Sequence, residues 1–149
     1  MALYEAGFQT VAAAAGAAYV EFRGGASNPF RVRELSMVAN AATATPVGLI
    51  RALAQSVTPG GTFLGQLVDG PAGAPAATMI PSTTFGTAPT ITANTYLRQS
   101  NIAATVGSGF IWFWSERDPL VIAKAGSLLL WNFSGAAGAI SACYIKWEE

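Results

Sequence analysis

The chain has 149 residues, of which 52% are apolar and 11% are charged, with 8 Lys and Arg, 8 Asp and Glu, and no His. Soluble domains usually carry about 25% charged residues, so this composition is poor in charge. The length fits one domain, residues 1–149, and the apolar content excludes disorder. The balanced charge argues against nucleic acid or an anionic membrane as partner, and the lack of His removes the usual residue of triad and zinc chemistry.

The N-terminal residues Met1–Glu5 lack the basic start of a signal peptide, so we expect no export signal. The Ala-rich run Val11–Ala18 favours a helix by composition but contains Gly16 and leads directly into a strand, so it is a strand or a single helical turn. Tyr19–Arg23 alternates apolar and charged residues and ends at a Gly pair. This pattern predicts a strand.

A second alternating run, Phe30–Arg33, follows Asn28-Pro29, and its apolar phase slips by one residue at Glu34. Such a slip predicts a β-bulge. Arg31 and Arg33 share the face opposite the apolar residues, where they are candidates for contact with the carboxylates of a partner protein. Two other outcomes stay open for them, an exposed edge or pairing with Glu21 on a neighbouring strand.

The middle of the chain predicts two further strands. Val47–Leu53 carries Arg51 as its only charge, which makes Arg51 a third candidate interface residue, and the turn residues Thr58–Gly61 close this strand. Thr62–Val68 forms the next strand. From Gly70 to Thr95 the chain has no charge and four spaced Pro residues, which exclude a long helix and predict an extended segment over the surface or onto a neighbouring subunit.

The last third contains one stretch long enough to cross a membrane, Ala125–Ile145, but Asn, Ser and Gly residues divide it into two short apolar runs. Two strands joined by a Gly-rich turn fit it better. The strands expected here are Tyr96–Ile102, Phe110–Trp114, Leu120–Ala123, Ser127–Phe133 and Ala139–Trp147.

Trp112 and Trp114 lie at positions i and i+2 and therefore share one strand face with Phe110, while Ile111 and Phe113 share the other. A row of this kind can stack a sugar or a base. Because both faces are apolar, burial of both in the core or in a subunit interface is the better interpretation. The two Trp residues are candidate interface residues together with the three arginines.

No other motif carries chemistry. The pair Glu116 and Asp118 flanks Arg117 before a Pro and fits a solvated hairpin connection better than a glycosidase pair. The single cysteine, Cys143, lies in an apolar strand pattern and predicts an inert buried thiol. Because we expect no export signal, we interpret the glycosylation triplet Asn132-Phe133-Ser134 as a chance match. We therefore expect no enzyme activity, no catalytic site, no cofactor and no metal.

The spacing of about 8–10 short strands predicts an all-β antiparallel β-sandwich, and eight strands in two sheets would make a jelly roll. A surface with so few charges is typical of subunits that bury large apolar interfaces. The C-terminal Lys146–Glu149 ends the last expected strand in charge, which would help to solvate a sheet edge.

Five segments together resemble the small jelly-roll virion proteins of tailed bacteriophages that decorate or cement the capsid. They are Tyr19–Arg23, Arg31–Glu34, Asn40–Leu49, Gly107–Trp112 and Gly126–Asn132. The resemblance implies a tumour-necrosis-factor-like sandwich that forms a homotrimer, is made in the host cytoplasm, and stabilises the virion by binding the major capsid protein on the outside of the assembled capsid. The alternative function is a carbohydrate- or receptor-binding module of a phage tail or fibre, which needs Trp112 or Trp114 exposed.

Overall fold

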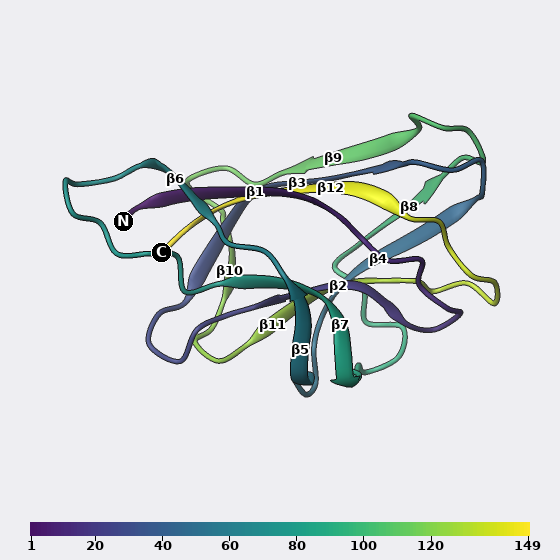
Figure 1. The fold of residues 1–149 in the computed structure, drawn as a ribbon, viewed down its shortest axis with the longest axis horizontal. Helices are drawn as coiled ribbons and strands as arrows, with labels where there is room; N and C mark the ends of the chain where they lie inside the picture. Colours follow the sequence, from purple (N-terminus) through teal and green to yellow (C-terminus); the bar gives the residue numbers. More distant parts are fainter.

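The computed structural model describes residues 1–149 and consists of two antiparallel β-sheets packed face to face (Figure 1). The expected all-β sandwich is therefore confirmed, with twelve strands rather than 8–10. Strands β1, β3, β9 and β12 run along the top of the view, and β2, β5, β7 and β11 along the bottom. We call these layers sheet A and sheet B.

Sheet A has the strand order β10-β3-β12-β1-β6, and β9 pairs with β3 beside β10. Sheet B has the order β5-β7-β2-β11-β4-β8. The strands of sheet A are β1 (Leu3–Gln9), β3 (Phe30–Ala39), β6 (Gln66–Asp69), β9 (Gly109–Phe113), β10 (Leu120–Ile122) and β12 (Ser141–Glu148). The strands of sheet B are β2 (Ala18–Arg23), β4 (Thr45–Arg51), β5 (Val57–Thr62), β7 (Ile80–Thr87), β8 (Arg98–Ile102) and β11 (Ser127–Trp131).

The core lies between the two sheets, because each central strand turns alternate residues inward. Trp147 is fully buried there and stacks on Tyr4, with ring centroids 5.8 Å apart. The expectation that Lys146–Glu149 solvates a sheet edge is wrong, since β12 is a central strand between β1 and β3. Tertiary pairing, which the terminal charges do not reveal, decides this position.

The predicted bulge in β3 is confirmed. Lys146 of β12 pairs with Glu34, but the next residue, Trp147, pairs with Val32, which leaves Arg33 as the extra residue. Val32 and Leu35 consequently both reach the core although they are three positions apart.

The first strand, β1, was not among the predicted strands, although its residues Leu3–Gln9 alternate between outward and buried positions. The run Val11–Ala18 turns at Gly16, where φ is 64°, and enters β2 only at Ala18. The predicted turn Thr58–Gly61 instead lies within edge strand β5. An edge strand pairs on one side only, so it tolerates Pro59.

The predicted strand Thr62–Val68 is interrupted, because the chain crosses from sheet B to sheet A between β5 and β6. Gly65 lies at this crossing, where a Cβ atom would collide with the indole ring of Trp147.

The charge-free segment Gly70–Thr95 has two parts. Residues 70–79 form no strand and lie over the end of the sandwich, where the Tyr4 hydroxyl donates to the Pro75 carbonyl at 2.6 Å. The Glu149 carboxylate accepts from the backbone N–H groups of Thr78 and Met79 at 2.8 and 2.6 Å. The second part contains β7, which joins sheet B between β5 and β2.

The chain alternates between the sheets: β1 and β3 belong to sheet A, and β2 and β4 to sheet B. After the insertion β5–β7, strand β8 lies in sheet B, β9 and β10 in sheet A, β11 in sheet B and β12 in sheet A. The two strands expected within Ala125–Ile145 are confirmed as β11 and the first part of β12. The structure holds no apolar helix of membrane-spanning length.

Candidate functional site

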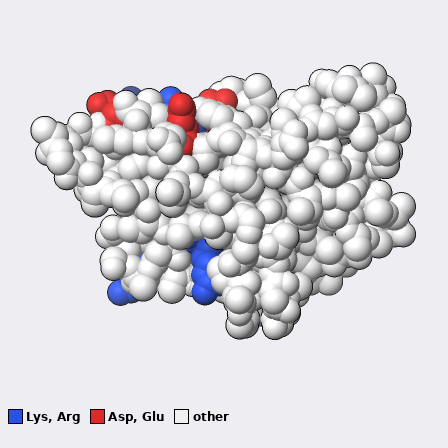
Figure 2. All heavy atoms as spheres, in the orientation of Figure 1, with Lys and Arg blue, Asp and Glu red and all other residues white.

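The outer face of sheet A carries a large share of the charged side chains. Strand register places Glu5 of β1, Lys146 of β12 and Glu34 of β3 in one row, and Glu148 opposite Arg31 in another. Opposite charges that face each other across strands stabilise a sheet modestly. Figure 2 shows acidic and basic atoms gathered at the upper left of the molecule, with a few basic atoms below and an otherwise uncharged visible face.

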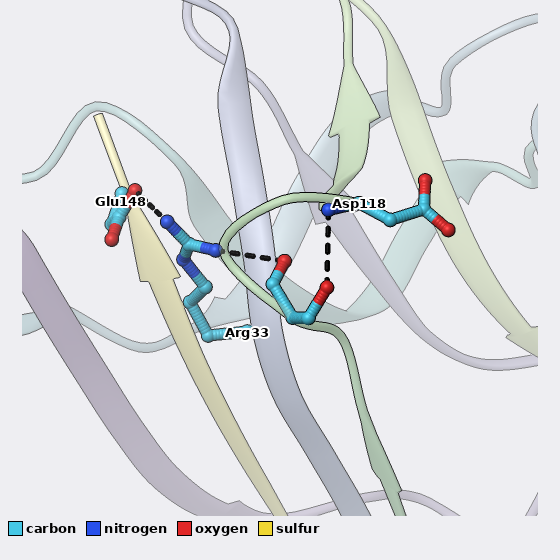
Figure 3. A network of polar contacts seen from close by, with 4 residues as sticks. Arg33, Asp118 and Glu148 are labelled. Carbon is cyan, nitrogen blue, oxygen red and sulfur yellow. Dashed lines mark hydrogen bonds and ion pairs between the residues drawn. The ribbon is translucent and has the colours of Figure 1, made fainter.

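Arg33, the bulged residue, closes a polar network at the edge of this face (Figure 3). Its Nη2 donates to Glu148 Oε2 at 2.7 Å, and its Nη1 donates to the carbonyl of Ser115 at 3.0 Å. The Asp118 N–H in turn donates to Ser115 Oγ at 3.1 Å. The Arg33 guanidinium therefore binds within its own chain and fixes the loop between β9 and β10.

That loop, residues 114–119, is not the predicted hairpin connection. Both β9 and β10 pair with β3, so the loop is an excursion from one continuous edge. Its residues Glu116, Arg117 and Asp118 are exposed, as expected for a solvated connection.

The structure does not gather the five predicted interface residues into one site. Arg31 lies on the outer face of sheet A, half-buried, and its side chain makes no hydrogen bond or ion pair. Arg51 ends β4 in sheet B, where its Nη1 donates to the Val121 carbonyl at 2.8 Å. Arg33 and Arg51 thus both donate to backbone carbonyls of this chain, Arg33 to the loop after β9 and Arg51 to β10.

The predicted alternative pairing of Arg31 or Arg33 with Glu21 is wrong, because Glu21 belongs to sheet B. Its carboxylate is fully buried beneath the segment after β4 and accepts from the N–H and the hydroxyl of Ser56. Arg23 Nη1 donates to the Ser56 carbonyl at 2.7 Å. These bonds fasten the chain after β4 to the outer face of sheet B.

The aromatic row of β9 faces inward. Phe110, Trp112 and Trp114 are half-buried against the core, and the Phe110 and Trp112 ring centroids lie 4.0 Å apart. The guanidinium of Arg98 lies 4.3 Å from the Trp114 ring centre, a cation–π contact. The two Trp residues therefore pack within the chain.

The opposite face of β9 is not buried within this chain, so the expected burial of both faces requires a subunit interface on this side. Ile111 is 54% exposed and Phe113 is 60% exposed, because no layer covers the outer face of sheet A at this edge. The sequence showed that both faces of β9 are apolar but not that one of them is uncovered in the single chain. We call Ile111 and Phe113 the β9 ridge.

Sequence analysis missed the opposite edge of sheet A, where β6 pairs with only the first half of β1, at Leu3–Glu5. A hollow of about 620 Å³ lies beyond this point. It is lined by Phe63 and Leu64 of the crossing segment, by the adjoining strand ends Thr62 and Gln66, and by Glu5, Ala6, Gly7 and Tyr144. We call it the β1 hollow. Only the tertiary course of the crossing segment creates it, and the run Thr62–Val68 gave no signal for it.

Tyr144 forms one wall of the β1 hollow, and its hydroxyl donates to Glu5 Oε2 at 2.9 Å. Burial, and then the hydrogen bond to the Glu5 carboxylate, raise the pKa of Tyr144 to about 12. The phenol therefore stays neutral and donates to Glu5 throughout the physiological range.

No group of three or more His, Cys, Asp or Glu side chains lies close enough to hold a metal ion. Cys143 is buried on the core side of β12, and burial raises the pKa of its thiol, so it is held as the neutral, unreactive form. Comparison of the chain with protein-family models, with curated proteins and with solved structures finds no match.

Proposed function

We propose that the chain is a virion structural protein that forms a homotrimer and stabilises the capsid of a tailed bacteriophage by binding its outer surface. The observation that carries this proposal is the β9 ridge, two large apolar side chains exposed on a rigid strand. A chain with 11% charged residues has little polar surface with which to offset such exposure, so a partner subunit is its natural cover.

The strand arrangement supports the jelly-roll part of the proposal. Without the insertion β5–β7, and with β9 and β10 counted as one strand because both pair with the same edge of β3, eight strands remain. Four of them lie in sheet A and four in sheet B. In this interpretation the insertion extends both sheets at one side, through β6 in sheet A and through β5 and β7 in sheet B.

The proposed mechanism is thermodynamic. A protein that binds only the assembled shell stabilises it by mass action, by about 2.7 kcal/mol per site at a concentration of one hundred times Kd. A trimer binds through several sites at once, which raises the effective concentration of each. The partners would be other copies of this chain and the major capsid protein, after synthesis in the host cytoplasm.

The binding-module alternative receives less support from the site. A carbohydrate platform needs exposed aromatic ring faces, but Trp112 and Trp114 pack against the core and against Arg98. We therefore propose the structural function alone.

Two measurements test the proposal. Light scattering after gel filtration should give the mass of a trimer, three times 15.3 kDa. Addition of the purified protein to capsids that lack it, from the phage that encodes the chain, should raise their disruption temperature in calorimetry. A monomer that leaves the disruption temperature unchanged would refute the proposed function.

A further inference from the structure

We propose that copies of this chain join head to tail through sheet A, so that the free edge of β9 in one copy pairs with the open part of β1 in the next. The β9 ridge then fills the β1 hollow. This inference rests on the homo-oligomer of the proposed function and names its contact surfaces.

The open part of β1 follows from its hydrogen-bond ladder. Ala2 and Thr10 donate backbone bonds to the β12 side, at Glu149 and Ser141. Bonding alternates along an antiparallel strand, so the odd residues of β1 direct their N–H and C=O groups away from β12. Strand β6 covers these groups only as far as Glu5. The backbone of Gly7 and Gln9 therefore forms an exposed, unpaired edge.

The free edge of β9 follows from the same reasoning. Trp114 donates its N–H to the Arg33 carbonyl and Ala39 donates to the Ser108 carbonyl, which fixes the even residues of β9 as those bonded to β3. The N–H and C=O groups of Gly109 and Ile111 consequently point away from the sheet and have no partner, whereas the Phe113 carbonyl on the same edge accepts from Arg98 Nη2 at 3.3 Å. An unpaired strand edge of this kind is a template for pairing with another chain.

The side chains at the two edges are complementary, as are their unpaired backbone groups. The β9 ridge projects apolar side chains from the outer face. Leu64, 75% exposed, lines the β1 hollow beside Glu5 and Tyr144. Phe63 adds an apolar wall on the core side, where it stacks on Phe8 with ring centroids 4.6 Å apart. Gly7 has no side chain and has free space around its Cα, so it leaves room for a side chain of a neighbouring strand. Added strands of this type gain affinity from main-chain bonds and specificity from side-chain pockets.

The position of the two edges determines the type of assembly. The β9 edge and the β1 hollow lie at opposite ends of sheet A, so each copy offers one of each. A contact between unlike surfaces is heterologous, and it generates a closed ring when the rotation per subunit permits. In a ring of three copies, the β9 ridge and the β1 hollow of every copy are both occupied.

Two variants separate the surfaces. The ridge variant, Ile111→Thr with Phe113→Thr, keeps β-propensity in β9 but removes the apolar ridge. The hollow variant, Gly7→Pro with Leu64→Asp, removes a donor from the open edge and places a charge in the hollow. Leu53→Asp is the matched control, because Leu53 is equally exposed on the chain that covers sheet B. Circular dichroism checks that each variant is folded.

We expect the ridge and hollow variants each to be monomeric, with self-association weakened at least a hundredfold, and the Leu53→Asp control to remain a trimer. An equal mixture of the two variants should form a 1:1 heterodimer, since one intact ridge and one intact hollow remain. This complementation also shows that both variants are folded.

The outcomes are distinguishable by native mass spectrometry. A wild-type trimer whose ridge variant stays trimeric overturns this inference and leaves the proposed function standing. Two monomeric variants that do not combine also overturn it, because the intact ridge of one variant then does not bind the intact hollow of the other. A monomeric wild-type chain overturns the proposed homotrimer and the inference with it.

Discussion

The side chain of Asn132 joins two segments that are distant in the sequence, residues 13–14 and its own loop, residues 132–136. It is fully buried, and its Nδ2 donates to the carbonyls of Ala13, Ala14 and Ala136, while its Oδ1 accepts from the N–H and hydroxyl of Ser134. A glycosylation enzyme could not reach this amide in the folded chain, which agrees with the interpretation of the triplet as a chance match.

Replacement of Asn132 tests this network. Asn132→Ala should lower the free energy of unfolding by about 2–3 kcal/mol, because buried carbonyls and the Ser134 N–H lose their partners. Asn132→Asp should cost more at pH 7, since it places a negative charge against three carbonyl oxygens. Urea unfolding measures both, with the exposed Asn101→Ala as the control. An Asp variant as stable as the wild type would contradict the assigned contacts.

Alkaline pH should destabilise the fold. Burial raises the pKa of Tyr19 to about 12, and Tyr144 is raised to about 12, against about 10 in an unfolded chain. A raised folded-state pKa gives stability that is fully present below pH 10 and is lost as the pH rises toward 12. Thermal unfolding from pH 8 to 12, with the tyrosinate absorbance recorded in parallel, should show this loss.

Tyr144→Phe provides the control, because it removes one of the two titrations and leaves Tyr19. Its stability should fall less steeply between pH 10 and pH 12 than that of the wild type. Equal slopes would argue against a raised pKa for Tyr144.

At the scale of elements, the β3 bulge determines how the edge of sheet A is built. The extra residue turns Arg33 toward both Glu148 and the loop 114–119, and this single guanidinium anchors the excursion between β9 and β10. The salt bridge is largely shielded, with side chains 14% and 17% exposed, so it is worth more than a typical surface pair.

Arg33→Ala should release the loop and lower the free energy of unfolding by about 1–3 kcal/mol. Hydrogen exchange at the Asp118 amide, whose N–H is bonded to Ser115, should become faster. Arg31→Ala is the matched control on the same strand, and we expect it to change stability by no more than about 0.5 kcal/mol. Unchanged exchange in the Arg33 variant would show that the loop is held by other contacts.

Strand patterns were most informative for strands that pair with a neighbour on both sides. Alternation located β2 and β3, and the phase slip located the bulge within one residue. Edge strands were less predictable: β5 contains turn residues, and β6 has four exposed residues and no alternation of burial. The inner strand β1 alternates over Leu3–Gln9 but was not among the predicted strands. Propensity alone does not describe a strand that pairs on one side.

For the whole molecule, an assembled state should make thermal stability depend on protein concentration. We expect the midpoint of unfolding to rise by about 2–4 °C for each tenfold increase in wild-type concentration, the range typical of a chain of this size. Phe113→Thr should remove most of this dependence, because it removes half of the β9 ridge. Scanning calorimetry at three concentrations measures both chains, and a wild-type midpoint that stays constant would indicate a monomer.

The sequence by itself determined the all-β class, the antiparallel sandwich, the bulge, the buried thiol and a surface poor in charge, because each depends on composition or on local alternation. The tertiary structure decided what covers each face of a strand: Glu21 is buried, the Trp row of β9 faces the core, and Ile111 and Phe113 are exposed. Alternation groups residues by face, but only the packing of distant segments determines what covers that face.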